Sequence, residues 1–201
     1  MAPTLHVGRL AAALGAFLLA VGVAAHALDE LRGRPLQTLL SRRALIAMAA
    51  VALGAAVAIG VAGMIIVSPL LAPLVAAGAF LVLAYNLELA GGRFHTDAWF
   101  AVAWGGFPAF TGYFVNSLTV RPAGVLVALA CCLTSVAQRR LSTPVRRLRR
   151  ATIDVRGTQT LRDGTVLELT RESLSDPLEG ALSVIWVALV VLAVGLVAVR
   201  A

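Results

Sequence analysis

Long apolar runs separated by short charged stretches dominate the pattern along the chain. Six runs approach the roughly 20 residues that a helix needs to cross a membrane. These runs are residues 10–28, 44–67, 70–87, 98–118, 121–138 and 178–199. The pattern therefore predicts an all-α integral membrane bundle of about six transmembrane helices, organised as a single membrane domain over residues 1–201.

Glycine and proline positions add local detail to three of these runs. Gly-Gly-Phe-Pro at 105–108 predicts a kink or a break in the fourth run. The Arg-Pro pair at 121–122 is typical of a first helical turn, which tolerates proline. Asp-Pro-Leu-Glu at 176–179 predicts that the last helix starts with Asp176 as its N-cap and Pro177 at its first position.

Composition agrees with a membrane protein. Hydrophobic residues make up 60% of the chain and charged residues 13%, and the mean hydropathy is +0.90. A soluble domain has about 45–50% apolar and about 25% charged residues. The composition therefore excludes an ordinary water-soluble enzyme, and it excludes a disordered chain, which would be poor in apolar residues.

The basic residues orient the predicted helices. All 17 are arginines, and the formal net charge is +7. In a soluble protein this charge would suggest nucleic acid, but here the arginines lie between apolar runs, so no nucleic-acid partner is expected. Fourteen of them lie in the loops at 29–43, 88–97 and 139–177. These loops are therefore predicted to be cytoplasmic, with both termini outside, in a bacterial or archaeal plasma membrane.

The first apolar run has an alternative interpretation as a cleaved signal peptide. A basic residue, an apolar stretch and the small-residue site at 25–27 fit that pattern. Cleavage would place the arginine-rich loop at 29–43 outside the cell. The positive-inside rule opposes that arrangement, so we predict a retained spanning helix.

Residues 142–177 are predicted to form a cytoplasmic insertion before the last helix. Within it, apolar residues from 153 to 169 flank the pair Asp163-Gly164. An Asp-Gly pair between such stretches predicts a small β-hairpin.

The first candidate site lies at the end of the first run. His26, Asp29 and Glu30 share one helix face because they are spaced by three and four residues. We predict Asp29 and Glu30 as catalytic residues and all three side chains as ligands of Mg²⁺, which prefers oxygen and is often shared with substrate phosphates. Arg32 and Arg34 are predicted to bind the phosphate oxygens of the substrate. The alternative is a solvated helix end with local ion pairs.

Two further clusters lie on the same predicted side of the membrane. Asn86 and Glu88 end the third run and are predicted to bind a substrate headgroup; their alternative roles are capping and hydrogen bonding between helices. Arg139 and Arg140 end the fifth run and are predicted to bind phosphate. Their alternative role is to anchor the chain to anionic lipid.

Residues 29–36, Asp-Glu-Leu-Arg-Gly-Arg-Pro-Leu, resemble the aspartate motif and following loop of the UbiA superfamily of membrane prenyltransferases. Ala-Tyr-Asn-Leu at 84–87 and Trp-Gly-Gly-Phe-Pro at 104–108 are similar to that family's later helix pair. The resemblance covers roughly residues 10–140. It implies a UbiA-like helical bundle, a site on the cytoplasmic face, and a polyprenyl diphosphate bound with Mg²⁺.

The chain departs from the family pattern at several positions. Ala25 and His26 stand where the motif has Asn and Asp, and Gly33 stands where a further aspartate is expected. At 138–140 the sequence is Gln-Arg-Arg, where the family has its second aspartate motif. The chain is thus a shortened and motif-degenerate match, with six predicted helices against about nine in the family.

Three interpretations of function stay open at this point. The first is a UbiA-like protein that binds an isoprenoid diphosphate or related lipid, as a Mg²⁺-dependent prenyltransferase if it is an enzyme. Metal and arginines would then stabilise the leaving diphosphate. The second is a non-catalytic lipid-binding or scaffold subunit, with a homo-oligomer or another protein as partner. The third, a small transporter, rests only on the interrupted fourth run.

Overall fold

The structure is a computed structural model that describes residues 5–198, and it is mostly helical. Two compact units divide it, with the boundary between Ser135 and Val136. Each unit is described by itself below. Whether both belong to the single membrane domain predicted from the sequence stays a prediction.

The first unit contains four long helical stretches and the first part of α8 (Pro122–Arg150), up to Ser135. The first runs through α1 (Val7–Phe17), a π-helical segment (Leu18–Ala25) and α2 (His26–Gly33). The second and third are α3 (Arg42–Ile66) and, after a 3₁₀ turn (Pro69–Leu71), α4 (Ala72–Asn86). The short α5 (Leu89–Gly92) leads to the fourth, which runs through α6 (Asp97–Ala101), a π-helical segment (Val102–Gly106) and α7 (Phe107–Ser117).

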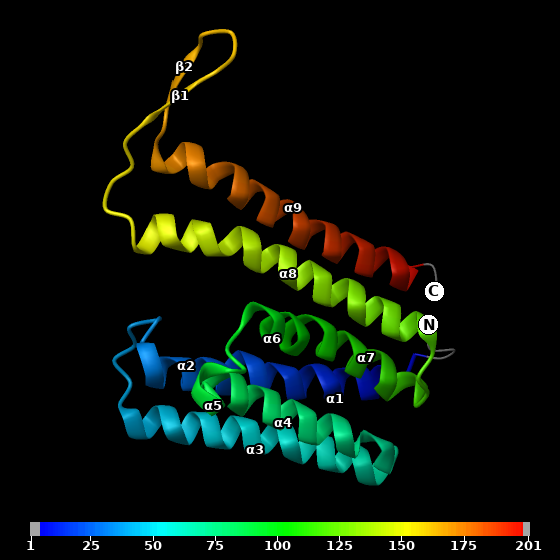
Figure 1. Ribbon diagram of the computed structural model, residues 1–201. Helices are drawn as coiled ribbons and strands as arrows, with labels where there is room; N and C mark the ends of the chain where they lie inside the picture. The colour runs from blue at the N-terminus through cyan, green and yellow to red at the C-terminus, as the bar shows by residue number, and fades with distance from the viewer. Residues whose placement is uncertain (1–4, 199–201) are drawn as a thin grey trace. The chain divides into compact units, whose positions relative to one another are not determined.

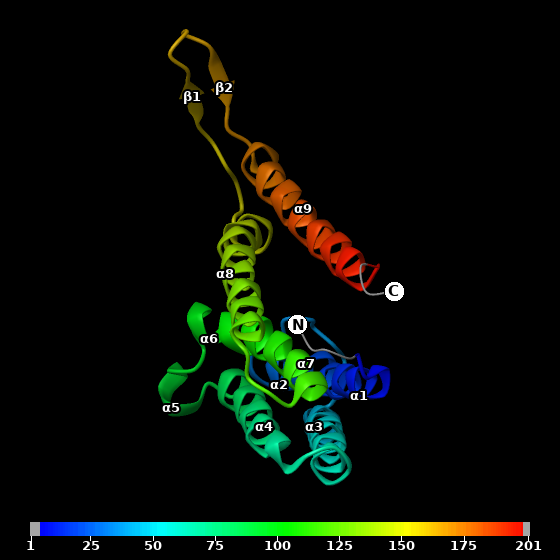
Figure 2. The same ribbon diagram turned by 90° about the vertical axis from the view of Figure 1, so that its right-hand side faces the viewer.

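These four stretches lie side by side and run antiparallel (Figures 1 and 2). The first stretch packs against α3 and α7, and α3 packs against α4. At one end, the His6 backbone N–H donates to Asn116 Oδ1 at 2.8 Å, which joins the start of α1 to the end of α7. At the other end, His95 lies against Tyr85 with 4.4 Å between ring centroids, which joins the start of α6 to the end of α4.

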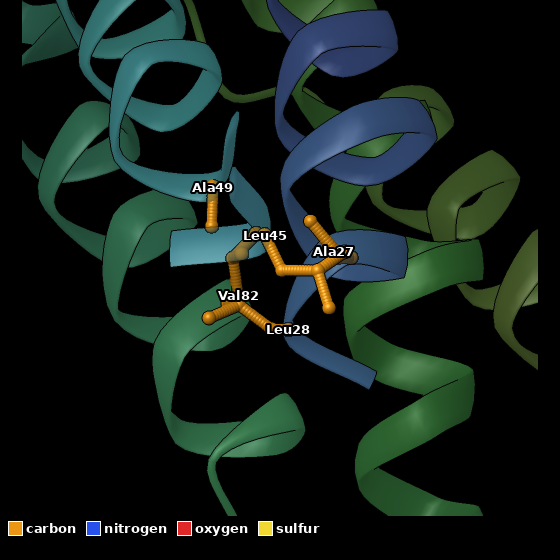
Figure 3. Packing of buried hydrophobic residues seen from close by; sticks show 6 residues of the cluster. Ala27, Leu28, Leu45, Ala49 and Val82 are labelled. Carbon is orange, nitrogen blue, oxygen red and sulfur yellow. The ribbon is translucent and has the colours of Figure 1, made fainter. Parts of the chain in front are cut away.

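The packed core of this unit lies toward the end where α2 and α4 finish. Figure 3 shows Ala27, Leu28, Leu45, Ala49 and Val82 converging from three helices. Three of these five side chains are alanine or valine, and such small residues let helix backbones approach closely. The helices therefore pack tightly here through close van der Waals contact, although few polar contacts join them.

Five helical stretches in the described part of the chain are long and apolar enough to cross a membrane. They are Val7–Gly33, Arg42–Ile66, Pro69–Asn86, Pro122–Arg150 and Arg171–Leu196. Five of the six predicted spans are thereby matched by length and composition. The remaining one, 98–118, forms a helix that runs between the same two ends of the unit as α1 and α4. Its tryptophans, glycines, proline and asparagine make it more polar than the others.

The break predicted at 105–108 is replaced by a change in helical geometry. The backbone at Gly106 and Phe107 stays in the right-handed helical region, and the chain continues from the π-helical segment directly into α7. Pro108 falls in the first turn of α7, where a missing N–H costs little. A π-helical segment therefore takes up the irregularity that the glycines and proline introduce.

The second unit contains the part of α8 (Pro122–Arg150) that follows Ser135. It also contains a hairpin and α9 (Arg171–Ala198). Strands β1 (Thr158–Thr160) and β2 (Val166–Glu168) pair antiparallel. The turn holds Gly164 at φ +87°, and Asp163 Oδ1 accepts from the Thr165 N–H at 3.0 Å. The predicted hairpin about Asp163-Gly164 is confirmed.

Both ends of the predicted insertion at 142–177 are helical instead. Helix α8 continues through Pro144 to Arg150, with arginines in its last turn, where the helix dipole favours positive charge. Helix α9 begins at Arg171, not at Pro177. Thr170 and Ser173 each accept from the other's backbone N–H through the side-chain oxygen, at 3.0 and 2.9 Å. This reciprocal cap starts the helix two turns before the predicted Asp176 cap.

Arginines join the two helices of the second unit. Arg149 pairs with Glu179 through two hydrogen bonds of 2.5 Å, which links the end of α8 to the start of α9. Arg171 donates to the Thr152 and Ile153 carbonyl oxygens, each at 3.0 Å. Arg171 thereby holds the start of the segment that leads from α8 to the hairpin.

The sidedness of the loops stays a prediction, and cysteine labelling tests it. We expect a membrane-impermeant maleimide to label Thr119→Cys from outside intact cells, and to label Thr160→Cys only after permeabilisation. The reason is the concentration of arginine in the predicted cytoplasmic loops. Both variants carry Cys131→Ser and Cys132→Ser, because these are the chain's two cysteines. The reverse labelling pattern, or labelling of both positions from outside, would contradict the topology.

Candidate functional site

The predicted site residues of α2 and α4 meet at one end of the first unit. Arg32 Nη2 lies 3.1 Å from Glu88 Oε2, and Arg32 Nη1 donates to the Leu87 carbonyl oxygen. Two clusters that are 50 residues or more apart in the sequence are thus joined directly. The arginine and the glutamate are each nearly half exposed, so this ion pair contributes little to stability. Both charges remain available to a headgroup that approaches from solvent.

Glu30 is turned inward and holds the loop that follows α2. Its side chain is 1% exposed. One carboxylate oxygen accepts from the Leu36 N–H at 2.9 Å. The other accepts from the Thr38 N–H at 2.7 Å and from the Thr38 hydroxyl at 2.9 Å. Three of the roughly four acceptor positions of a carboxylate are therefore occupied by the protein itself. The predicted catalytic and metal roles of Glu30 stay predictions, beside this structural role.

Arg34 also points into its own loop. Its Nη1 donates to the Thr38 carbonyl oxygen at 2.9 Å, and its Nη2 lies 3.5 Å from the Leu40 carbonyl oxygen. The backbone of Arg34 is left-handed, at φ +46°, and it terminates α2. Arg34 therefore closes the turn that Glu30 holds from the other side, and a phosphate would compete with these carbonyl oxygens for its guanidinium group.

Asp29 differs from Glu30 in being open to a ligand, as Glu88 also is. It is partly buried, and it interacts electrostatically with His26, His95 and Glu88. The His26 ring has Nδ1 2.9 Å from the Val21 carbonyl oxygen, and His95 has Nδ1 3.1 Å from the Tyr85 carbonyl oxygen. A hydrogen bond to a carbonyl oxygen requires the proton on Nδ1, so each neutral ring keeps Nε2 as an acceptor or metal ligand.

His95 is the residue that sequence analysis did not select for the site. It lies 66 positions from Asp29, so only tertiary packing brings the two together. The sequence did contain a signal for this residue. Arg-Phe-His-Thr-Asp at 93–97 follows a glycine pair and lies in a loop predicted on the same side of the membrane as the other clusters. The ring lies against Tyr85 at an interplanar angle of 31°, and this contact holds it at the helix ends.

The described residues include no group of three or more histidine, cysteine or acidic side chains that could hold a metal ion. The predicted Mg²⁺ ligands His26, Asp29 and Glu30 therefore do not form a complete site by themselves. Mg²⁺ usually keeps several waters and shares one or two carboxylates with substrate phosphates. The predicted ion accordingly needs a phosphate ligand to complete its coordination.

The other predicted substrate-binding residues have local roles. Asn86 is 3% exposed, and its amide donates back to the Val82 carbonyl oxygen at 2.7 Å, one turn earlier in α4. Arg139 and Arg140 lie on the part of α8 that belongs to the second unit. Their assignment to phosphate stays a prediction.

An apolar cavity of about 160 Å³, partly open to its surroundings, lies in the first unit. Its wall comes from α1, α3, α4 and α7 and from both π-helical segments, and it extends from Arg9 to Val21 along the first stretch and from Trp104 to Val115 along the fourth. Alanines and glycines form much of the wall, so the space exists because small residues face one another. Val82, which packs with Leu28 in the core beside α2, also lines this cavity.

Comparison with known proteins gives no assignment. No family model matches the chain, no curated protein matches it, and no solved structure matches it. The fold and the site define a helical protein with five stretches long and apolar enough to cross a membrane. Within its first unit it carries a charged cluster at one end and an apolar cavity inside.

Proposed function

We propose that this chain is a UbiA-like membrane protein that binds an isoprenoid diphosphate or a related lipid. The charged head would lie at Asp29, where α2 and α4 end, and part of the apolar chain would enter the cavity. The cytoplasmic position of this end follows from the arginine-rich loops and is part of the proposal.

The apolar cavity is the observation that carries this proposal. An apolar cavity of about 150 Å³ stays dry and binds benzene. The cavity here, at about 160 Å³, has a similar size and an apolar wall. It therefore accommodates a segment of about six carbons, which corresponds to roughly one isoprene unit.

The π-helical segments support the same site. Such segments are rare and occur frequently at functional sites. Both segments of this chain contribute to the cavity wall, through Ala20 and Val21 on one side and Ala103 and Trp104 on the other. The extra residue in each turn widens the helix there, so the wall is irregular where the cavity needs space.

The charged end supports a head that carries phosphate. Asp29 supplies one hard oxygen ligand, and Arg32 supplies donors in the fork geometry that suits phosphate. In the enzyme form of the proposal, one Mg²⁺ shared by Asp29 and the diphosphate would stabilise the leaving group of prenyl transfer. His26 and His95 are exposed, and each neutral ring, with Nδ1 against a carbonyl oxygen, keeps Nε2 as a proton acceptor beside the proposed head site.

A second candidate function is a non-catalytic lipid-binding or scaffold subunit. Glu30 and Arg34, two of the predicted site residues, already bind the loop at 36–40. A site left with Asp29 and with Glu88, which pairs with Arg32, holds less metal charge than a site with two aspartate motifs. This observation favours binding without turnover. A stoichiometric protein partner that co-purifies with the chain, with no prenylated product, would support this function.

The Asp29→Asn variant tests the head site. We expect Mg²⁺-dependent binding of geranylgeranyl diphosphate to weaken by about tenfold or more, because the amide keeps the size of the side chain but removes the charge that a hard cation needs. Isothermal titration of the protein in detergent, with Mg²⁺ and with EDTA, measures this change. Asp154→Asn, which removes an exposed carboxylate of the second unit, is the matched control and should leave binding intact.

Arginine variants separate the phosphate contacts from the fold. Arg32→Ala should weaken diphosphate binding, with less effect on geranylgeraniol, which has no phosphate. Arg150→Ala, an exposed arginine at the end of α8, should have almost no effect. If wild-type protein binds the diphosphate equally with Mg²⁺ and with EDTA, the metal part of the proposal is wrong. If it binds neither the diphosphate nor the alcohol, the proposed function itself is wrong.

A further inference from the structure

The end of α8 carries a strongly basic face. Residues 139–150 contain six arginines and no acidic residue. At about 100° per residue, five of these arginines fall within about 120° of the helix circumference, with Thr143 inside the same sector. These five arginines are the basic face of α8: Arg139, Arg140, Arg146, Arg147 and Arg150.

The other side of this helix end is engaged by the protein. Val145 is 8% exposed, and Arg149, which lies outside the basic face, forms the ion pair with Glu179 of α9. The arginines of the basic face are exposed, apart from the half-buried Arg139. Helix α8 therefore uses one arginine for its contact with α9 and presents the others to its surroundings.

The length of α8 brings this face to the level of lipid headgroups. Helix α8 is one of the stretches long and apolar enough to cross a membrane. At a rise of about 1.5 Å per residue, Arg146 and Arg147 lie about 36–38 Å from Pro122 along the axis, and an average tilt of about 20° reduces this depth to about 34–35 Å. The hydrocarbon core of a bilayer is about 30 Å thick, and the headgroups extend the total to about 40–45 Å. A helix that enters the hydrocarbon core at Pro122 therefore carries these two arginines among the headgroups on the other side.

The side chains of the basic face reach back toward the apolar part of α8. Helical side chains point toward the N-terminus of their own helix. Arg146 shows this direction, because its Nη2 donates to Thr143 Oγ1 at 3.3 Å, one turn earlier. By the same tilt, Arg150 covers the turn that holds Arg146 and Arg147. The charged groups therefore lie closer to the hydrocarbon core than their backbone positions alone indicate.

We infer that the basic face of α8 binds the phosphate group of an anionic phospholipid of the surrounding bilayer. Arg147 and Arg150 are three residues apart and Arg146 and Arg150 are four apart, so neighbouring guanidinium groups can hold one phosphate between them. A zwitterionic phospholipid also has a phosphate group, but its ammonium group meets the same arginines and opposes binding. The face therefore selects lipids by their net charge.

The rest of the helix favours a lipid over a soluble polyanion. Residues 122–138 contain no charged residue, so the basic face continues directly from a segment that suits the hydrocarbon core. A nucleic acid or a free phosphate ion would reach these arginines only from the aqueous side. The centre of the lipid site is Arg146, Arg147 and Arg150. None of these residues belongs to the cavity or to the proposed head site at Asp29, so the lipid site and the diphosphate site can fail independently.

Lipid binding to the full chain in detergent, measured by native mass spectrometry, tests this inference. We expect dioleoyl phosphatidylglycerol to bind about tenfold or more tightly than dioleoyl phosphatidylcholine, which has the same acyl chains and a phosphate group but no net charge. Raising the salt concentration from about 0.1 to about 0.5 M should reduce this preference, because salt screens exposed charges. Inorganic phosphate at millimolar concentration should leave it unchanged, and competition by that ion would overturn the assignment to a lipid.

Two double variants of equal net charge assign the preference to the basic face. Arg147→Gln with Arg150→Gln should remove most of it, since one arginine near a membrane surface contributes about fivefold. Glutamine forms helices about as well as arginine, so α8 should stay intact, and circular dichroism checks this. Arg156→Gln with Arg162→Gln removes the same charge from exposed positions outside the basic face and should keep the preference.

The outcomes separate this site from the proposed function. Equal binding of the two lipids by the wild type, an equal loss of preference in both double variants, or tighter binding of a DNA duplex than of phosphatidylglycerol would overturn the lipid site. Geranylgeranyl diphosphate binding should survive in the Arg147→Gln, Arg150→Gln variant, and its loss there would assign the basic face to the substrate instead. Asp29→Asn should keep the preference for phosphatidylglycerol. A wild type that has this preference but binds no diphosphate would refute the proposed function and support the lipid site.

Discussion

Replacing Gly105 by alanine is expected to lower the melting temperature by several degrees. A Cβ atom at this position would lie 2.6 Å from the Cys131 carbonyl oxygen and 2.3 Å from Ser135 Oγ. The Ser135 hydroxyl group can rotate away, but Ser135 Cβ, at 2.9 Å, and the carbonyl oxygen are fixed by the backbone of α8 and can move only if the helices separate. Overpacking of this kind costs about 1–3 kcal/mol. It outweighs the roughly 0.5–1 kcal/mol by which alanine normally stabilises a helix relative to glycine.

Gly112→Ala is the matched control for this prediction. Gly112 lies in the same helical stretch, and a Cβ atom there would have nothing within 4 Å. We expect this variant to melt at the same temperature as the wild type or slightly above it. Melting curves of both variants, recorded by tryptophan fluorescence in the same detergent, make the comparison. Equal melting temperatures for the Gly105→Ala and Gly112→Ala variants would show that the close contact with α8 is absent in solution.

The helices could be predicted well because runs of about 20 apolar residues have the length that crosses a bilayer. Apolar runs of about 20 residues have few other stable structures in a bilayer. The ends of the helices were predicted less well, because caps depend on local hydrogen bonds. Asp176-Pro177 and Thr170-Arg-Glu-Ser173 are both plausible starts in the sequence. The reciprocal bonds of Thr170 and Ser173 decide in favour of the earlier start.

The spacing argument grouped Asp29 and Glu30 into one site, and the structure separates them. Neighbouring residues on a helix point about 100° apart, so the two carboxylates have different surroundings. Asp29 faces His26 and His95, whereas Glu30 faces the loop at 36–40. The path of that loop depends on left-handed backbone at Arg34 and Gln37. Neither residue is a glycine, so the sequence contains little warning of this turn.

The contact of Arg32 with Glu88 and the cavity both depend on how the helices pack. Helical periodicity shows which residues share a face, but it does not show which faces meet. The cavity lies where small residues from four helical stretches face one another, so no single segment predicts it. Thr111 illustrates the limit, because an isolated threonine in an apolar run gives no sign that its hydroxyl lacks a partner.

Replacing Glu30 by glutamine is expected to release the loop that follows α2. Glutamine keeps the volume of the side chain but replaces one acceptor oxygen by an NH₂ group. This NH₂ group is itself a donor, and it would face the N–H and hydroxyl donors from which the carboxylate accepts. At least one of the donors from Leu36 and Thr38 then loses its acceptor. We expect the amides of Leu36 and Thr38 to exchange with deuterium about tenfold faster or more, since hydrogen bonds to a charged acceptor are about twice as strong as neutral ones.

The neighbouring variant Asp29→Asn provides the comparison that separates the two carboxylates. It should leave the exchange of Leu36 and Thr38 unchanged, because Asp29 makes no hydrogen bond to that loop among those found in the described chain. Glu30→Gln should accelerate loop exchange while it keeps most of the Mg²⁺-dependent diphosphate binding. If Glu30→Gln instead leaves the loop protected and abolishes that binding, Glu30 is a metal ligand, as the sequence predicts, and its role in holding the loop is secondary.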